Sequence, residues 1–439
     1  MRPLVVTVGT AGGRGRAALI AGCTAVVSGV LMVAAAMLRL GGEPVGYPRT
    51  TGLFAPLADP GTRSGTIFGV VLLTVPFLAL LNQGVRLGTA ARRRRYDALA
   101  ILGATRADLR RWAAVEVGVP GAAGAVLGLG VYWLLRLGLG SWLESREIGA
   151  LVPPHVGPGL WAVPVVLVVS ALAAIAGAQS VRSSRRGRRT DRAFPVLWVV
   201  LLVAGASLLV LATGGSTATS DRQLMTLPAL VLTVSGLTGS APWLTLTVAH
   251  AVGSRTSSAH WLLATRRLQL DPTSASRAGL ATGAAGLAVG VCAALVAEVA
   301  HYRGPDRRAY TDPVLVVVAL AGLAFLLVGV ALAVHITDSV LAERRAYAAL
   351  SATGFPDAQL VAALRSEAVI ATLPIAMTGC LLGGVGYASL AESSGVWLPW
   401  AVAAVGATLA AAVASSYAAA ALLAPVVRAA TASAAIRTE

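Results

Sequence analysis

Ten apolar stretches constrain this chain more than any other feature of its sequence. A helix of about 20 apolar residues crosses the hydrocarbon core of a bilayer. Only 12% of the 439 residues are charged, about half of what a soluble protein carries. The sequence therefore predicts an all-α integral membrane protein of about ten transmembrane helices, near residues 17–38, 65–83, 113–135, 159–180, 194–213, 224–249, 278–300, 313–337, 367–390 and 399–424.

The basic residues indicate how these helices are oriented. All 35 are Arg, against 19 acidic residues, and the formal net charge is +16. With the N-terminus inside, 26 Arg fall in cytoplasmic segments and 9 in outer ones, as the positive-inside rule expects. The Arg runs 92–95 and 182–192 also resemble nucleic-acid patches, but orientation already accounts for them, so no nucleic-acid partner is expected. We predict that both termini are cytoplasmic.

Missing residue types exclude several chemistries. The chain contains no Lys, so it lacks the P-loop residue that contacts nucleotide phosphates, and Schiff-base catalysis through Lys is excluded. Its three Cys lie in separate apolar stretches and its five His are scattered, so neither a disulfide framework nor a metal site is expected. We therefore expect a protein that is not an enzyme, with no catalytic residue, metal or cofactor in this chain.

An internal repeat organises the sequence. A shorter match, at an offset of 261, pairs Arg16 with Arg277 just before the first and seventh predicted helices. The main match has an offset of 251 and aligns Arg93–Leu99 with Arg344–Leu350, Gly103 with Gly354, and Glu116 with Glu367.

These matches divide the chain into three parts. We predict a first four-helix repeat over residues 1–193, a two-helix connector over 194–254 and a second four-helix repeat over 255–439. Because the connector has an even number of helices, both repeats begin on the cytoplasmic side and are parallel. Parallel repeats are a common transporter design, so the repetition favours transport.

Glycines four residues apart predict close packing between helices. In a membrane, small residues let two helix backbones approach each other, and van der Waals contact then holds them together. Such pairs occur in three predicted helices: Gly124 with Gly128, Gly286 with Gly290, and Gly379 with Gly383.

The repeated cytoplasmic segment predicts a short amphipathic helix followed by a turn. In the first copy, near residues 92–103, Tyr96, Leu99 and Leu102 recur at helical spacing and Gly103 ends the pattern. The second copy, near 343–354, has Tyr347, Leu350 and Gly354. Such a helix can lie in a groove of a soluble partner or can anchor the loop to anionic lipid. Its recurrence favours a partner that is itself present in two copies.

Glu116 and Glu367 stand near the starts of their predicted helices, at the membrane edge. A buried carboxylate needs a partner there. Nearby candidates are Arg110 or Arg111 for Glu116, and Arg365 for Glu367; paired in this way, the carboxylates would hold the surface helix at a fixed angle. They could instead relay protons, but their position at the edge favours the structural role.

The first copy resembles the FtsX-like (MacB-type) ABC transporter permease domain. Arg93, Arg94, Leu99, Leu102, Gly103 and Ala104 match its Arg-Arg…Leu…Leu-Gly-Ala pattern, and a Glu-containing helix follows. The pair Tyr96-Asp97 replaces the usual Glu-Ile. The outer loops, near 39–64 and 301–312, are short, so the resemblance is to a ten-span form without the large extracytoplasmic domain that many members carry.

This resemblance implies a function for the chain. It implies the permease subunit of an ABC transporter in the plasma membrane, moved by two copies of a separate P-loop ATPase that bind ATP and Mg²⁺; a permease homodimer is not required. Alternatives from other classes are an ion-coupled secondary transporter and a non-transporting membrane regulator of an extracytoplasmic partner. The implied ATPase-coupling residues are Arg93, Arg94, Tyr96, Leu99, Leu102, Gly103, Arg344, Arg345, Tyr347, Leu350 and Gly354.

Overall fold

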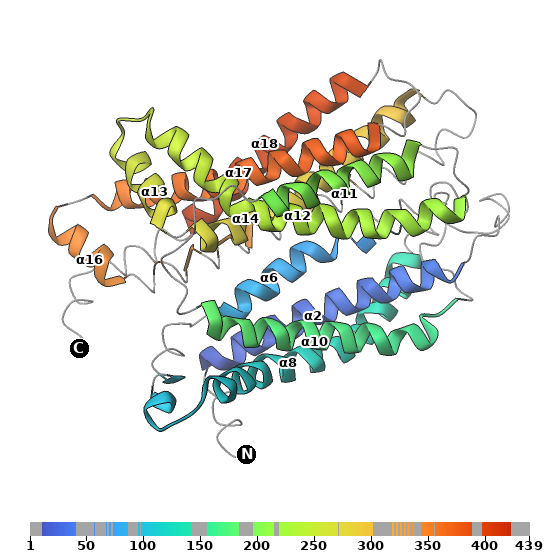
Figure 1. Cartoon of the computed structure of the whole chain (residues 1–439), viewed down its shortest axis with the longest axis horizontal. Coiled ribbons are helices and arrows are strands. Elements are labelled where there is room, and N and C mark those ends of the chain that lie inside the picture. The colour runs from blue at the N-terminus through green and yellow to red at the C-terminus, as the bar shows by residue number, and fades with distance from the viewer. Residues whose placement is uncertain are drawn as a thin grey trace. The chain divides into compact units, whose positions relative to one another are not determined.

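Every regular element that the structure describes is a helix (Figure 1). This confirms the all-α prediction for the described part of the chain. The structure is a computed structural model, and it describes residues 11–40, 57, 67, 70–71, 73–86, 95–96, 98–141, 156–183, 196–214, 219–270, 272–301, a discontinuous set between 318 and 340, 344–354, 356–388 and 397–422.

Several of these helices are long and apolar enough to cross a membrane. Helices α11 (Val196–Gly214), α12 (Thr219–Gly253) and α14 (Pro272–His301) coincide with the predicted spans 194–213, 224–249 and 278–300. The predicted span 65–83 is described mainly as the short helix α6 (Thr74–Arg86), and 313–337 is described only in pieces, so the count of ten stays a prediction. Five stretches in the described ranges meet the length and composition of a span: Arg14–Leu38, Arg106–Gly138, Gly159–Ser180, Asp357–Gly384 and Pro399–Ala419.

The chain forms two compact units. The first comprises Met1–Gly187 with Ala212–Leu227 and Leu295–Leu320. The remaining residues, Arg188–Leu211, Pro228–Ala294 and Ala321–Glu439, form the second unit. The predicted boundaries of repeats and connector, at residues 193 and 254, stay predictions.

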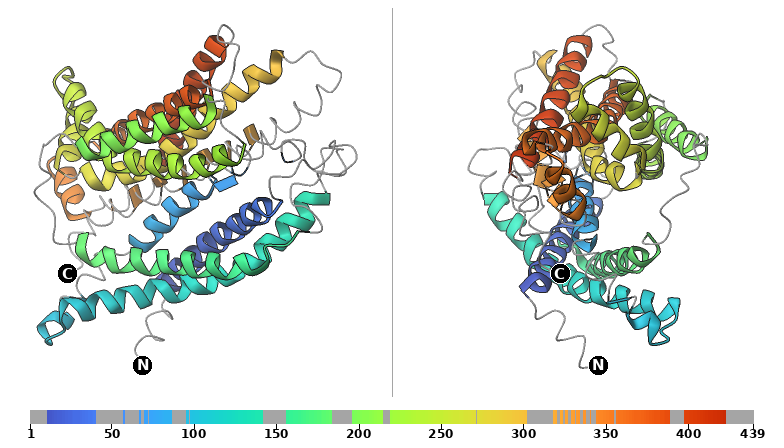
Figure 2. Two further views of the ribbon diagram at one scale, coloured as in Figure 1. Left: turned by 45° about the vertical axis from the view of Figure 1, so that its right-hand side comes forward. Right: turned by 90° about the vertical axis from the view of Figure 1, so that its left-hand side faces the viewer.

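In the first unit, α8 (Arg106–Leu134) packs against both α2 (Ala11–Leu38) and α10 (Ala162–Ser183), as Figure 2 shows. A π-helical turn, η1 (Leu135–Leu139), continues α8, and a 3₁₀ turn, η2 (Gly159–Trp161), precedes α10. The shorter helix α6 (Thr74–Arg86) lies against α2. Apolar side chains of α2 and α8 form the buried core of this unit: Met32, Val33, Met37 and Tyr132, with Leu57 and Ile67.

Glycines hold α2 and α8 at close range. A Cβ atom added to Gly128 would lie 2.5 Å from the Ser28 Cβ, and one added to Gly124 would meet the Thr24 hydroxyl and the Ala21 carbonyl. The close approach also lets the Ser28 hydroxyl donate a hydrogen bond to the Ala125 carbonyl, at 2.9 Å. The packing predicted from the Gly124–Gly128 spacing is therefore confirmed.

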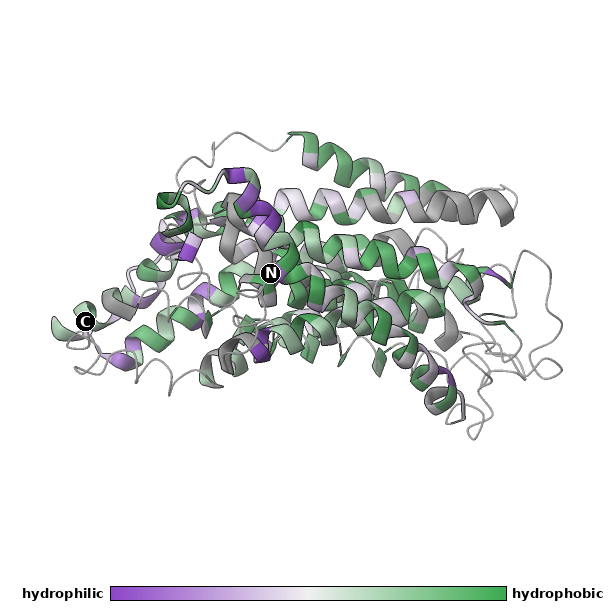
Figure 3. Ribbon diagram, turned by 90° about the horizontal axis from the view of Figure 1, so that it is seen from below, coloured by the Kyte–Doolittle hydropathy of each residue, from purple (hydrophilic) through white to green (hydrophobic). Residues whose placement is uncertain are grey.

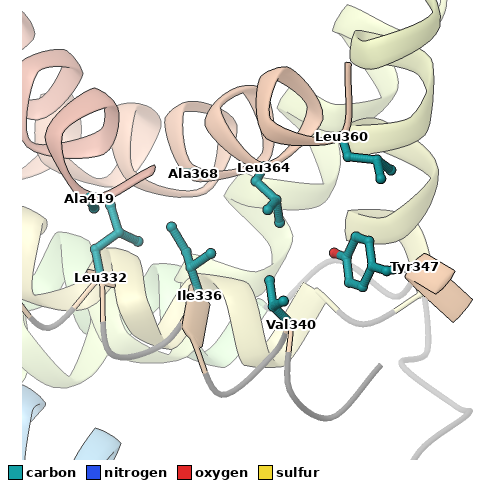
Figure 4. Close-up of a cluster of buried hydrophobic side chains, with 8 residues drawn as sticks. All are labelled: Leu332, Ile336, Val340, Tyr347, Leu360, Leu364, Ala368 and Ala419. Atoms are coloured by element: carbon teal, nitrogen blue, oxygen red, sulfur yellow. The ribbon is translucent and has the colours of Figure 1, made fainter. Parts of the chain in front are cut away.

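The second unit is built mainly from α11, α12 and α14 together with four further helices. These are α13 (Ala259–Leu270), α16 (Arg344–Ala352), α17 (Asp357–Ala388) and α18 (Trp397–Leu422). A buried apolar cluster joins α16, α17 and α18 to Leu332, Ile336 and Val340 (Figure 4).

Glycines also line the contact between α14 and α17. A Cβ atom on Gly286 or Gly290 would meet the carbonyl of Ala376 or Cys380 on α17. The reverse holds for α17, because a Cβ atom on Gly379 or Gly383 would meet carbonyls of α14. Both predicted glycine pairs therefore lie at close helix contacts.

The outward faces of the long helices are apolar. Figure 3 shows many hydrophobic residues along the long helices, with strongly hydrophilic residues mainly near helix ends. Large apolar side chains such as Val119 and Leu127 on α8, and Leu167 on α10, are more than half exposed. Exposed apolar surface of this extent suits contact with lipid and not with water.

Candidate functional site

The first surface turn, residues 98–105, links a short helical segment to α8. The Ala104 amide donates to the Leu99 carbonyl at 3.0 Å, and the Gly103 amide donates to the Ala100 carbonyl at 3.1 Å. Gly103 has φ +91°, in the left-handed region that favours glycine. Ile101 and Leu102 are 86% and 83% exposed. The predicted sequence of helix, glycine turn and span is present, and it presents two apolar side chains at its tip.

Thr105 fixes where α8 begins. Its hydroxyl accepts a hydrogen bond from the Asp108 amide at 3.2 Å, and the Asp108 carboxylate accepts from the Thr105 amide at 3.1 Å. This capping box supplies partners for backbone groups that the first helical turn leaves unpaired. The cap therefore sets the point at which the turn ends.

Thr105→Ala is expected to loosen the first turn of α8 without unfolding the chain. Hydrogen exchange at the first α8 amides should become about fivefold faster, because the N-cap side chain is lost. Thr353→Ala is the matched control, since the exposed Thr353 hydroxyl donates only within its own helical turn, to the Leu350 carbonyl. Equal exchange rates in the wild type and Thr105→Ala would show that the cap does not fix the helix start.

The second surface turn, residues 349–354, has the same backbone form with a different surface. The Gly354 amide donates to the Ser351 carbonyl at 2.9 Å, and Gly354 has φ +85°. Here Tyr347 is buried in the cluster of Figure 4 and Leu350 packs against it. The exposed residues at the tip are Ala352, Thr353 and Gly354, none of which has a large apolar side chain. The second turn thus lacks the apolar tip of the first.

The four predicted coupling arginines differ in whether the structure describes their backbone. Arg93 and Arg94 lie outside the described residues. Arg344 and Arg345 form the first turn of α16.

Glu116 is the centre of a polar cluster in the first unit. Its Oε1 atom lies 2.5 Å from Nη1 of Arg16 on α2, and its Oε2 atom accepts a hydrogen bond from the Tyr96 hydroxyl at 3.1 Å. Arg16 also donates to the carbonyls of Gly84 and Val85 near the end of α6, at 3.1 and 3.2 Å. The first cluster (Arg16, Tyr96 and Glu116) therefore connects α2, α6, α8 and the surface segment.

Glu367 occupies the corresponding place in the second unit. Its Oε2 atom lies 3.5 Å from Nη1 of Arg267 on α13. Arg267 also donates a hydrogen bond to the Tyr347 hydroxyl, and its guanidinium lies 5.2 Å from the centre of the Tyr347 ring. The second cluster (Arg267, Tyr347 and Glu367) therefore connects α13, α16 and α17.

The two clusters correspond residue by residue. The sequence match at offset 261 paired Arg16 with Arg277, and for that reason missed Arg267. In the first unit the Arg is part of the long helix α2, whereas in the second it stands on a separate short helix before α14. The signal was present in the main match, because each member of the second cluster stands 251 residues after its counterpart in the first: Arg267 after Arg16, Tyr347 after Tyr96, and Glu367 after Glu116.

The structure supplies different cations from those that local sequence suggested. Arg110 and Arg111 lie six and five residues before Glu116 on the continuous helix α8, so their side chains leave the helix on another face. Arg365 is two residues from Glu367 on α17, and its guanidinium lies 5.6 Å from the centre of the Tyr417 ring. The cations on the two carboxylates instead come from distant parts of the chain.

The chemistry of both clusters is that of structural ion pairs. The four charged side chains are largely buried, with 12% to 20% of each exposed. A carboxylate in such a place is stable only with a cation and hydrogen-bond donors around it. Within the described ranges, no three His, Cys, Asp or Glu side chains gather closely enough to hold a metal ion.

Part of this site lies in a segment that matches a known protein family. Residues 66–186 match the family model of the FtsX-like permease C-terminal domain. This segment resembles that domain. It contains α6, the first surface turn, Tyr96 and Glu116, while Arg16 and the second cluster lie outside it. No curated protein and no solved structure matches the chain.

Proposed function

We propose that the chain is the permease subunit of an ABC transporter of the FtsX-like class. The observation that carries this proposal is the family match over residues 66–186, because it covers the first surface turn together with α8 and α10. FtsX-like permeases normally work with an ATPase partner. The apolar faces of the long helices support a multi-pass membrane protein. The Arg distribution supports cytoplasmic termini, and the likeness to FtsX-like permeases supports a plasma-membrane location.

In this proposal the two surface turns dock two copies of a separate P-loop ATPase. ATP and Mg²⁺ bind to that partner, since this chain has no Lys for a P-loop and is itself not an enzyme. Closure of the ATPase pair rocks two FtsX-like repeats against each other and expels a substrate, or signals mechanically to one, on the outer side. The exposed tip with Ile101 and Leu102 supports docking at the first turn, because a groove on a partner would remove both side chains from water.

Co-purification tests the proposal directly. A tagged chain, solubilised gently, should recover a P-loop ATPase that hydrolyses ATP in the complex. Recovery of no ATPase contradicts the proposal. Transport by the purified chain alone, driven by an ion gradient and lost in Glu116→Gln, would support a secondary transporter instead.

Replacing both tip residues, Ile101→Ser with Leu102→Ser, is expected to lower ATPase recovery. The loss should be at least about tenfold, since each buried apolar side chain contributes roughly 1.5–3 kcal/mol to binding. Leu160→Ser is the matched control, because Leu160 is 89% exposed but stands just before α10, at the opposite end of a span from the surface turns. The measurement is the ratio of ATPase to tagged chain after purification, and an unchanged ratio would place docking elsewhere.

A further inference from the structure

We propose that the first and second clusters are two clamps that hold each surface turn to the membrane helices and pass its movement to them. Tyr96 and Tyr347 are positioning residues in this mechanism, and the Arg and Glu of each cluster form its fixed side. The inference rests on the proposed function for the source of movement. The clamp geometry itself depends only on this chain.

The position of Glu116 fits a clamp at the membrane edge. Helix α8 has 29 residues, so it is about 44 Å long, against about 30 Å for the hydrocarbon core. Its first turns carry Arg106, Arg110 and Arg111, and these charges favour a position beyond the core on the side of the surface turn. Glu116, ten residues after Arg106, lies where the helix enters the apolar layer. A polar contact made there connects the outer part of α8 to its neighbours at a fixed point along the helix.

Arg16 extends the first clamp to the segment that enters the surface turn. Besides the ion pair with Glu116, it donates to the Gly84 and Val85 carbonyls. These carbonyls lie in the last turn of α6, where helical carbonyls lack partners within the helix and a cation is favourable. One guanidinium thus contacts the helix before the surface segment and the carboxylate of the helix after it.

Tyr96 joins the surface segment itself to this centre. Its hydroxyl donates to Oε2 of Glu116, whereas Arg16 donates to Oε1. The carboxylate therefore contacts a different element through each oxygen. Hydrogen bonds to a charged group are stronger than neutral ones. A displacement of the surface segment therefore pulls on Glu116, and through Glu116 on α8 and α2.

The second cluster uses the same three residue types with a different hydrogen bond: the Tyr347 hydroxyl accepts from Arg267, whereas the Tyr96 hydroxyl donates to Glu116. Its Arg comes from α13, and its Tyr is additionally fixed by the apolar cluster of Figure 4, in which Tyr347 packs against Leu360 and Leu364 of α17. Local sequence around Arg16 and Arg267 has little in common. The three residue types recur at the offset of the internal repeat although the sequence around each Arg has diverged, which supports a shared role for the two clusters.

A distance measurement tests the clamp without any partner. The native thiols Cys23, Cys292 and Cys380 are buried, so spin labels can be directed to Ala100→Cys on the surface segment and Ala123→Cys on α8, both exposed. In lipid nanodiscs the wild-type background should give a narrow distance distribution, and Tyr96→Phe should broaden it. Tyr417→Phe removes the same hydroxyl from α18 and should leave it narrow. An unchanged distribution in Tyr96→Phe overturns the clamp.

A coupling measurement then separates transmission from docking. In the complex with the ATPase, Tyr96→Phe with Tyr347→Phe should leave recovery unchanged while the stimulation of ATP hydrolysis by the permease falls at least about tenfold, because each cluster loses one hydrogen bond to a charged group. Tyr417→Phe should change neither. Unchanged stimulation, or equal losses of recovery and stimulation, contradicts the clamp. If the wild-type chain recovers no ATPase, the proposed function fails, and the label distances alone decide the clamp.

A charge cycle tests the fixed side of the clamp. Arg16→Gln and Glu116→Gln each leave a largely buried charge without its opposite charge, so each should broaden the label distances. The double variant removes both charges and should restore part of the narrow distribution. Purely additive broadening would mean that Arg16 and Glu116 act independently, which overturns their pairing as the fixed side.

Discussion

Proline at both surface turns, Gly103→Pro with Gly354→Pro, is expected to abolish stimulation of the partner ATPase. The two glycines have φ values of +91° and +85°, whereas the proline ring fixes φ near −65°. A non-glycine residue held at positive φ already costs about 1–3 kcal/mol, and proline cannot adopt this conformation. Each amide also loses a hydrogen bond, to the Ala100 or the Ser351 carbonyl. Both turns must therefore rebuild.

The control for this pair lies two residues away in the first turn. Thr105 has φ −73°, which proline can adopt, and the second copy carries Pro356 at the equivalent position. Thr105→Pro should therefore weaken the helix cap and leave ATPase stimulation largely intact. The measurement is ATP hydrolysis by the reconstituted complex, at equal amounts of membrane-inserted chain. Full stimulation in the double proline variant would show that the turns do not couple the two proteins.

Much of the fold follows from local sequence patterns. The apolar length of the segments predicts α8, α10, α17 and α18, because a helix satisfies its own backbone groups within lipid. Gly103 and Gly354 mark the turns because each stands where a helical pattern of apolar residues ends. The glycine pairs on α8, α14 and α17 predict close packing for a similarly local reason. In each case the deciding residues lie within a few positions of one another.

The polar clusters could not be predicted in this way. Glu116 finds its cation 100 residues earlier in the chain, and Glu367 finds Arg267 on a separate helix. Sequence proximity favoured Arg110, Arg111 and Arg365. In a helix, however, residues that are two, five or six positions from a carboxylate lie on a different face from it. The packing of α2 and α13 determines which distant Arg pairs with each carboxylate, and no local pattern contains that information. The repeat contained a partial signal, since Arg16 and Arg267 share the offset of the Tyr and Glu pairs.

Valine at Gly128 is expected to destabilise the first unit, and the chain offers a control on the same helix. A Cβ atom at Gly128 would lie 2.5 Å from the Ser28 Cβ and 3.0 Å from the Ala25 carbonyl, so α2 and α8 must separate. Overpacking of this kind costs about 1–3 kcal/mol. The separation would also disturb the hydrogen bond from Ser28 to the Ala125 carbonyl.

Gly130→Val makes the same chemical change two residues further along α8, where nothing lies within 4 Å of the added Cβ. Its effect on stability should stay within about 0.5 kcal/mol, as for exposed sites in general. Thermal unfolding in one detergent, followed by size-exclusion chromatography, should place the midpoint of Gly128→Val well below those of the wild type and Gly130→Val. Because the first cluster depends on α2 and α8 staying in register, Gly128→Val should also broaden the Ala100–Ala123 label distances. A lowered midpoint with unchanged distances would mean that the clamp tolerates a shift between these helices.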